Sequence, residues 1–306
     1  MSKLYQNCAA ECVDSILLLV WIYLNNIITD RSFAFHGFFQ EQHAEAQSTD
    51  RREGKERDGA SGLLEAILDR DNLNRAYKRV KGNRGAAGID GMTVEEALPW
   101  LKERREELLR SIRDGSYMPG PVRRKEIPKP DGGVRKLGIP TVVDRVIQQA
   151  IAQKLQNIWE PLFSDSSYGY RPKRSAQQAI QKVKKYAEEV YRYAVSVDLS
   201  KYFDTLNHEL LMNLLHRQIQ DMRVLRLIKK YLKSGVMENG VVCKTEEGSL
   251  QGGPLSPLLA NIYLNEFDWE MYRRGVKLVR YAECLPRVNA QQSVCWNPAG
   301  SIWKAG

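Results

Sequence analysis

The sequence predicts an α+β fold, in which helices and β-hairpins alternate irregularly along the chain. Apolar residues recur at helical spacing in several separate segments, and strand-like segments surround turns rich in Gly and Pro or built on Asn-Gly. The irregular order of these elements favours an α+β fold over a doubly wound parallel sheet. The chain has 306 residues and an apolar share of 43%, which is enough to bury a sizeable core.

The first 60 residues are predicted to be a poorly structured extension and linker. Their apolar run at 16–24 is too short to span a bilayer, so no membrane association is expected. A signal peptide is a competing interpretation, but Asp14 interrupts it and no clear cleavage site follows; a buried helix or a membrane anchor would also fit the run. A polar run at 47–62 leads to the patterned region, so the folded domain is expected to begin near Ser61.

Capping and stop residues mark the boundaries of the expected helices. Thr93 and Glu96 have the spacing of a capping box for a helix that reaches about Asp114, where Gly115 is a natural stop. Helical spacing and caps predict further helices at residues 63–84, 141–159, 175–192, 207–217, 221–235 and 256–275.

The expected strands fall between these helices. Residues 122–127 and 134–139 alternate around a Pro-Lys-Pro-Asp-Gly-Gly turn, and 236–247 surround an Asn-Gly turn, so both segments predict hairpins. The runs at 195–198 and 276–282 are apolar and rich in β-branched residues, which is typical of buried strands.

Composition points to a polyanionic partner. The 46 Lys and Arg residues exceed the 37 Asp and Glu residues, and the formal net charge is +9. Such an excess favours nucleic acid as a partner, although a merely basic soluble protein has the same composition. The five cysteines are odd in number and scattered, which argues against a disulfide framework and fits a reducing, cytoplasmic location.

Two short segments have chemistry suited to metal and phosphate. The strand at 195–198 presents Asp198 at its end, before a tight turn, and a carboxylate placed in this way suits a hard cation. Taken alone, such an Asp is more often a turn residue. Lys129 and Arg135 flank the Gly turn of the first hairpin, from which two cations can close over phosphates; a solvated basic hairpin is the competing interpretation.

Six segments, taken in this order, resemble reverse transcriptases, especially those encoded by group II introns. They are residues 74–91, 127–140, 163–172, 195–204, 248–257 and 278–284. The resemblance covers about 61–282 and implies a right-hand polymerase with fingers and an incomplete palm, and with no thumb. Retron and diversity-generating relatives fit within the family as well.

The resemblance also implies a function for each matching residue. Asp198 would bind Mg²⁺; Lys129, Arg135 and Gln251 would bind the incoming nucleotide; Lys78, Arg79, Lys81 and Arg84 would contact template RNA. Phe203 would reject a ribose 2′-hydroxyl, with core packing as the competing interpretation. Arg171 would either contact the template backbone or brace the fingers, and Gly252 and Gly253 would let the backbone approach substrate.

The sixth segment departs from the family pattern at the metal site. Glu283 and Cys284 stand where the family has two Asp residues. The extra methylene of Glu283 displaces its carboxylate by about an ångström, which octahedral Mg²⁺ tolerates poorly, so its function as a catalytic metal ligand is weak. Cys284 offers a soft ligand that does not suit Mg²⁺. The domain is therefore expected to span 61–283, and 284–306 is interpreted as an unrelated, frame-shifted tail.

The sequence thus predicts an RNA-directed DNA polymerase of a group II intron, with RNA template, DNA primer and dNTP as partners. The chain itself is expected to be truncated, because no thumb sequence is discernible in it. It is also expected to be inactive, because its metal ligands are degenerate. The alternative is a non-catalytic, maturase-like remnant that binds intron RNA and assists splicing. An inert pseudogene product is a third interpretation.

Overall fold

The computed structural model describes residues 62–128, 134–189, 202–238, 241–243, 248 and 252–282, and the short strands at 294–296 and 302–304. The chain divides into two compact units, 59–290 and 1–58 with 291–306. The described part of the latter is an antiparallel pair, β5 (Val294–Trp296) and β6 (Ile302–Lys304). These strands are three residues long, which is too short for an alternating pattern to predict them from the sequence. The predicted extension at 1–60 lies outside the described residues.

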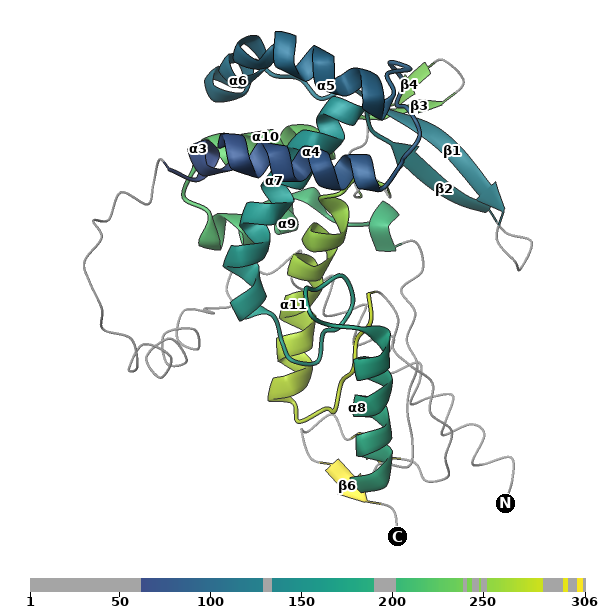
Figure 1. Ribbon diagram of the computed structural model, residues 1–306. Coiled ribbons are helices and arrows are strands. Elements are labelled where there is room, and N and C mark those ends of the chain that lie inside the picture. Colours follow the sequence, from purple (N-terminus) through teal and green to yellow (C-terminus); the bar gives the residue numbers. More distant parts are fainter. Residues whose placement is uncertain are drawn as a thin grey trace. The chain divides into compact units, whose positions relative to one another are not determined.

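Helices dominate the larger unit (Figure 1). They are α3 (Gly62–Leu68), α4 (Arg70–Gly82), α5 (Val94–Glu103), α6 (Arg105–Asp114), α7 (Val142–Trp159), α8 (Ala176–Glu189), α9 (His208–Gln218), α10 (Met222–Leu232) and α11 (Ser256–Arg273). The helix starts predicted at Thr93, Asn207 and Asp221 are confirmed, since each side chain accepts a hydrogen bond from a backbone N–H of the following helix. Thr141 caps α7 in the same way.

The single helix expected from Thr93 to Asp114 is wrong, because Arg104 interrupts it. The capping box is present and Gly115 ends α6 in the left-handed conformation, but Arg104 has φ −102° and ψ 17°. Buried residues lie on both sides of the break, Val94 and Ala97 in α5 and Leu109 and Ile112 in α6, so both helices pack against the core.

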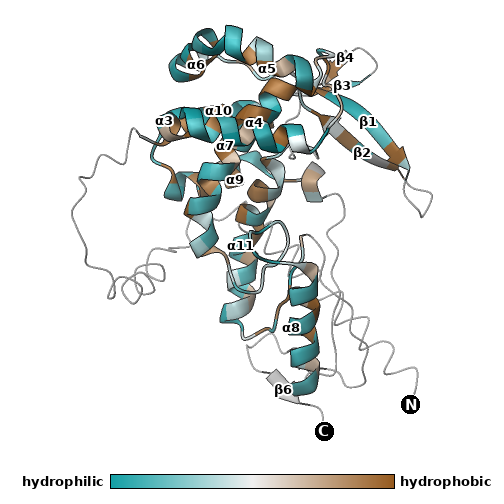
Figure 2. Cartoon of the chain, viewed as in Figure 1, coloured by the Kyte–Doolittle hydropathy of each residue, from teal (hydrophilic) through white to brown (hydrophobic). Residues whose placement is uncertain are grey.

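Both predicted hairpins are confirmed and join one four-stranded sheet of order β2-β1-β3-β4. Strand β1 (Val122–Pro128) pairs antiparallel with β2 (Val134–Ile139), and β3 (Val236–Glu238) pairs antiparallel with β4 (Val241–Cys243). The parallel β1–β3 contact involves the first two residues of β1 alone, so the rest of the long hairpin extends beyond β3 (Figure 1). Its end is hydrophobic (Figure 2), since Ile127 and Val134 are 41% and 53% exposed.

Helix α7 forms the centre of the fold, and α4 packs along it (Figure 1). Asn72 of α4 is fully buried and joins the two helices, because its Nδ2 donates to the carbonyls of Ile67 (2.8 Å) and Ala150 (3.1 Å). Gln153 of α7 donates in return to the Asn72 side-chain oxygen at 2.9 Å. Helix α11 is the second largely buried helix. Among the described residues no helix is both long and apolar enough to cross a bilayer.

Residues 276–279 form no strand, but Arg280 and Tyr281, in the second half of the strand expected at 276–282, are both bridge residues. Arg280 pairs with Ser167 through two hydrogen bonds, from the Tyr168 amide to the Arg280 carbonyl and from the Arg280 amide to the Ser166 carbonyl, both at 2.8 Å. Ala282 then turns the chain with φ 58°. The partner strand expected at 195–198 lies outside the described residues, so its pairing with this segment stays a prediction.

Asp144 attaches the base of the hairpin to α7. Its carboxylate is 2% exposed and accepts hydrogen bonds from the Tyr117 hydroxyl (2.7 Å), the Thr141 hydroxyl (2.7 Å) and the Gly120 amide (3.1 Å). Burial raises the pKa of Asp144 above its ordinary value, although these hydrogen bonds act in the opposite direction. A buried carboxylate therefore fixes the segment that enters β1.

The raised pKa predicts how Asp144 affects stability. Because its pKa is raised, Asp144 binds a proton more readily in the folded protein than in the unfolded chain. Its contribution to the free energy of unfolding therefore rises as pH falls through the folded-state pKa. This contribution is complete below the unfolded-state pKa of 3.8. In denaturant titrations at several pH values, the stability of the wild-type chain relative to Asp144→Asn should increase on acidification. A difference that is constant or shrinks would contradict the assignment.

Candidate nucleotide and nucleic-acid site

The turn after the predicted metal strand is anchored to α11. Tyr202 donates its hydroxyl to the Ala260 carbonyl at 3.0 Å and packs edge-to-face on Phe203, with ring centroids 5.6 Å apart. Phe203 is 7% exposed, which supports its core-packing function; its effect on the sugar stays a prediction. Asp198 lies outside the described residues.

The segment that carries Gln251 is attached at both of its described ends. Gly248 donates its amide to the Leu206 carbonyl at 2.8 Å, and its carbonyl lies 2.6 Å from Nε2 of His208. At the other end Gly252 has φ 125°, and a Cβ there would collide with the carbonyl of Gly138 in β2. The side chain of Gln251 itself is outside the described residues.

Gly252 and Gly253 both lie in close contact with other parts of the protein, and their approach to substrate stays a prediction. A Cβ on Gly253 would collide with the Oε1 atom of Gln148, as one on Gly252 would with Gly138. These contacts bring the segment at 248–253 against the fingers hairpin. Arg135 lies on the same strand, β2, opposite Ile127, although its side chain is not described; Lys129 lies outside the described residues.

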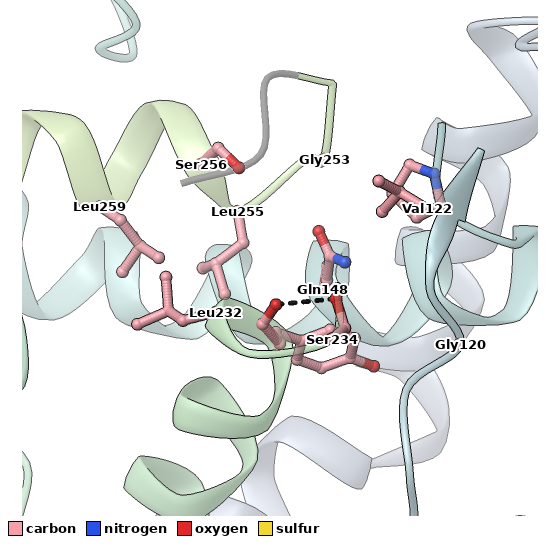
Figure 3. A pocket seen from close by; sticks show the side chains of 11 residues that line it. Gly120, Val122, Gln148, Leu232, Ser234, Gly253, Leu255, Ser256 and Leu259 are labelled. Carbon is pink, nitrogen blue, oxygen red and sulfur yellow. Dashed lines mark hydrogen bonds between the residues drawn. The ribbon is translucent and has the colours of Figure 1, made fainter. Parts of the chain in front are cut away.

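A pocket lies beneath Gly253 (Figure 3). Gly120 and Val122 at the start of the hairpin, Gln148 of α7 and Ser234 after α10 line it, and the Gln148 amide points towards Gly253. The Ser234 hydroxyl donates to the Tyr231 carbonyl at 3.0 Å. Its volume of about 20 Å³ holds about one water molecule, so the pocket is a packing feature below the segment and not a nucleotide site.

Arg171 braces the loop that precedes α8. Its guanidinium donates to the Glu160 carboxylate (2.8 and 3.0 Å) and to the carbonyls of Ser164 (2.7 Å), Ser167 (2.9 Å) and Glu160 (3.4 Å). It also lies over the Phe163 ring, 5.2 Å from the centroid. Every N–H of the guanidinium is engaged, so a contact to template RNA would require one of these bonds to break. The geometry supports bracing, one of the two functions that the family pattern leaves open.

A second buried arginine, Arg280, joins α11 to the end of the described palm. Its guanidinium binds Asp268 with three contacts of 2.7–3.0 Å and donates to Asn261 Oδ1 (2.9 Å), the Ala282 carbonyl (2.9 Å) and Ser167 Oγ (2.7 Å). Arg280 and Asp268 are 2% and 0% exposed. Burial raises the pKa of Asp268, and the adjacent guanidinium opposes that shift.

This ion pair positions the residue before Glu283. Asn261 also donates to the Gly169 carbonyl at 2.8 Å, and a Cβ on Gly169 would collide with the Ala282 amide. Tyr170 and Ala282, on the two sides of this contact, both have left-handed backbone angles, φ 56° and 58°. The chain therefore enters position 283 from a strained residue that buried hydrogen bonds hold in place.

The four predicted RNA contacts lie together on the last turn of α4 and just after it. Lys78, Arg79, Lys81 and Arg84 are exposed, and none forms an ion pair with any residue that the structure describes. Cations at a helix C-terminus also interact favourably with the helix dipole. The result is a basic surface available to a polyanion.

Two further arginines hold the loop that follows this basic surface. Arg145 of α7 donates to the Ala86 carbonyl at 2.7 Å, and Arg123 of β1 donates to the Ala87 carbonyl at 2.6 Å. Burial lowers the pKa of Arg145. The loop is thereby fixed between α4 and the hairpin, which joins the basic end of α4 to the base of the fingers.

The donor set for a metal does not fit Mg²⁺. No group of three or more His, Cys, Asp or Glu side chains among the described residues could hold a metal ion. At the positions where the family pattern predicts metal ligands, the sequence has Asp198, Glu283 and Cys284, all outside the described residues. One hard carboxylate, one lengthened carboxylate and a soft thiol make a poor octahedral site.

Comparison with known proteins identifies the family. A family model described as reverse transcriptase (RNA-dependent DNA polymerase) matches residues 127–283, just over half of the 306-residue chain. The chain belongs to the reverse transcriptase family. Among curated relatives of this reverse transcriptase, group II intron-encoded protein LtrA of Lactococcus lactis subsp. cremoris is 41% identical over 207 residues, which are 67% of this chain and 34% of LtrA.

Further relatives agree with the group II intron branch of the family. Protein YkfC of Escherichia coli (strain K12) is 39% identical over 69% of this reverse transcriptase and 57% of YkfC. The putative COX1/OXI3 intron 2 protein of Saccharomyces cerevisiae is 32% identical over 67% of this chain and 24% of its own length. The chain thus spans about a third of LtrA and just over half of YkfC. A solved partial Cas6-RT-Cas1–Cas2 complex has 23% identity and a TM-score of 0.49, covering 72% of this chain and 37% of that one.

Several residues that shape this reverse transcriptase site are not indicated by the sequence pattern. Arg280 lies in a segment where a strand is predicted, and Asp268 and Gln148 lie within predicted helices. His208 directly follows the cap predicted at Asn207. An Arg within the apolar run at 278–282 is the available signal, since a charge in a buried segment needs a buried partner. The identity of that partner depends on tertiary contacts.

Removing one member of the Arg280–Asp268 pair should destabilise the protein strongly. Asp268→Ala leaves a buried, uncompensated guanidinium, and we expect the free energy of unfolding to fall by about 3–5 kcal/mol. Glu106→Ala, which breaks the exposed Arg105–Glu106 pair, is the matched control and should cost about 0–1 kcal/mol. Denaturant unfolding followed by circular dichroism measures both, and equal losses would exclude a structural function for the buried pair.

Proposed function

We propose that this chain retains the nucleotide-binding and RNA-binding framework of an RNA-directed DNA polymerase of a group II intron. The arrangement of three segments carries the proposal. The turn with Phe203, the segment with Gln251 and the strand with Arg135 are joined through the contacts of Gly248 and Gly252. In this proposal Arg135 and Lys129 hold the triphosphate of a dNTP, and Gln251 lines the nucleotide pocket.

Chemistry at this site would depend on a divalent ion, with Asp198 as its remaining hard ligand. In nucleotidyl transfer, paired divalent ions activate the primer hydroxyl and stabilise the leaving group. The degenerate ligands Glu283 and Cys284 do not fit Mg²⁺, so the proposed function of this chain is binding without efficient polymerisation. The residues that the structure describes would orient nucleotide and RNA.

A primer-extension assay tests the loss of catalysis. With an RNA template, a DNA primer, dNTPs and Mg²⁺, the chain should give no detectable extension, because one carboxylate is replaced and another displaced. Asp198→Asn is the control for contaminating polymerase, since any extension that persists in this variant comes from another protein. Processive copying that disappears in Asp198→Asn would overturn the proposal.

A second candidate function, non-catalytic binding of intron RNA that assists splicing, is favoured by the exposed basic surface on α4. Cations that neutralise phosphates release counterions, so binding by this surface weakens with added salt. The basic surface needs no metal ligand, and it is independent of the substitutions at 283 and 284.

Neutralising this surface should change the salt dependence of RNA binding. Each phosphate contact contributes about 0.7–0.9 to the steepness of the plot of log K against log salt. In the variant with Lys78→Gln, Arg79→Gln and Lys81→Gln, three contacts are lost, so we expect this plot to become shallower by about 2–3. Filter binding of group II intron RNA at several salt concentrations measures it. The control neutralises Lys182, Lys184 and Lys185 on α8. Equal effects of the two triple variants would show that binding follows net charge, not this surface.

A further inference from the structure

His208 makes a short, buried contact to the segment that carries Gln251. It is the first residue of α9 and is 6% exposed, and its Nε2 atom lies 2.6 Å from the Gly248 carbonyl. The carbonyl can only accept, so Nε2 carries the proton and donates. Nδ1 is buried with no hydrogen-bond partner among the residues that the structure describes, so the contact to Gly248 is the hydrogen bond that the ring makes there.

The turn before α9 holds Gly248 through both of its peptide groups. The Gly248 amide donates to the Leu206 carbonyl at 2.8 Å, while its carbonyl accepts from His208. Gly248 has φ 88°, a conformation that residues with a Cβ rarely adopt. The start of the segment at 248–253 is therefore fixed in position and in backbone direction by residues 206–208.

The same turn carries Phe203, so the contact of His208 also relates the position of Gly248 to that of Phe203. Tyr202 anchors the turn to α11 through the Ala260 carbonyl, and Phe203 follows it directly. His208 then ties Gly248, three residues before Gln251, to this turn. At its other end the segment rests through Gly252 on the Gly138 carbonyl. The two described ends of the segment are therefore held by different parts of the fold, Gly248 by His208 and Gly252 by the hairpin.

We propose that His208 is a positioning residue that sets the nucleotide-binding segment at 248–253 relative to Phe203; this inference rests on the proposed nucleotide function. In this proposal His208 acts through its Nε2–H donor. Glutamine places its amide nitrogen where Nε2 of histidine lies, whereas asparagine places its own nearer to the position of Nδ1. His208→Gln keeps the donor to Gly248 and His208→Asn loses it, with similar polarity in both variants.

Hydrogen exchange with mass spectrometry tests the positioning directly. Peptides that contain Gly248 should exchange about tenfold faster in His208→Asn and within about twofold of wild type in His208→Gln, as expected for the loss or retention of one hydrogen bond. Peptides from α7 should keep their protection in both variants. The inference is overturned if His208→Asn exchanges like wild type, if His208→Gln behaves like His208→Asn, or if α7 loses protection to the same extent as the segment.

Binding of a fluorescent dGTP analogue with Mg²⁺ separates this inference from the proposed function. We expect about tenfold weaker binding in His208→Asn and binding within about twofold of wild type in His208→Gln. If wild type binds no nucleotide while the exchange pattern is as expected, the nucleotide function is refuted and His208 still positions the segment. If wild type binds and the two variants bind equally, the positioning function for nucleotide is refuted.

Discussion

The buried pair of Arg280 and Asp268 is the constraint on which this palm depends. Desolvating two charges is expensive, and the pair is tolerated because every guanidinium N–H and both carboxylate oxygens have partners. Those partners come from α11, from the loop at 164–169 and from the chain just before Glu283. Helix α11 is itself buried along most of its length, so the position of residues 280–282 is set by the core.

A second set of contacts ties the fingers to the palm. Asp144 fixes the chain that enters β1, and the Gly138 carbonyl in β2 receives Gly252 from the segment at 248–253. The opposite described end of that segment, Gly248, contacts His208. The small cavity under Gly253 leaves little free space beside that glycine. Contacts to the hairpin and to the start of α9 thus hold the two described ends of this segment.

Local features of the fold could be predicted from the sequence, while features that depend on distant partners could not. Thr93, Asn207 and Asp221 could be predicted as caps because their hydrogen bonds involve residues two or three positions away. No Gly or Pro marks the break at Arg104, and the bridge between Arg280 and Ser167 joins residues far apart in the sequence. Among the candidate site residues, the family pattern indicated Phe203 and the basic end of α4. The partner of Arg280, Asp268, could not be predicted, because the tertiary structure determines which residues meet.

The scaffold and the chemistry of this reverse transcriptase depend on different residues. Arg280, Asp268 and Asn261 satisfy one another through hydrogen bonds, and none of these bonds requires a metal ion or the side chain at position 283. The hydrogen-bond framework of the described palm therefore does not depend on which side chains stand at 283 and 284.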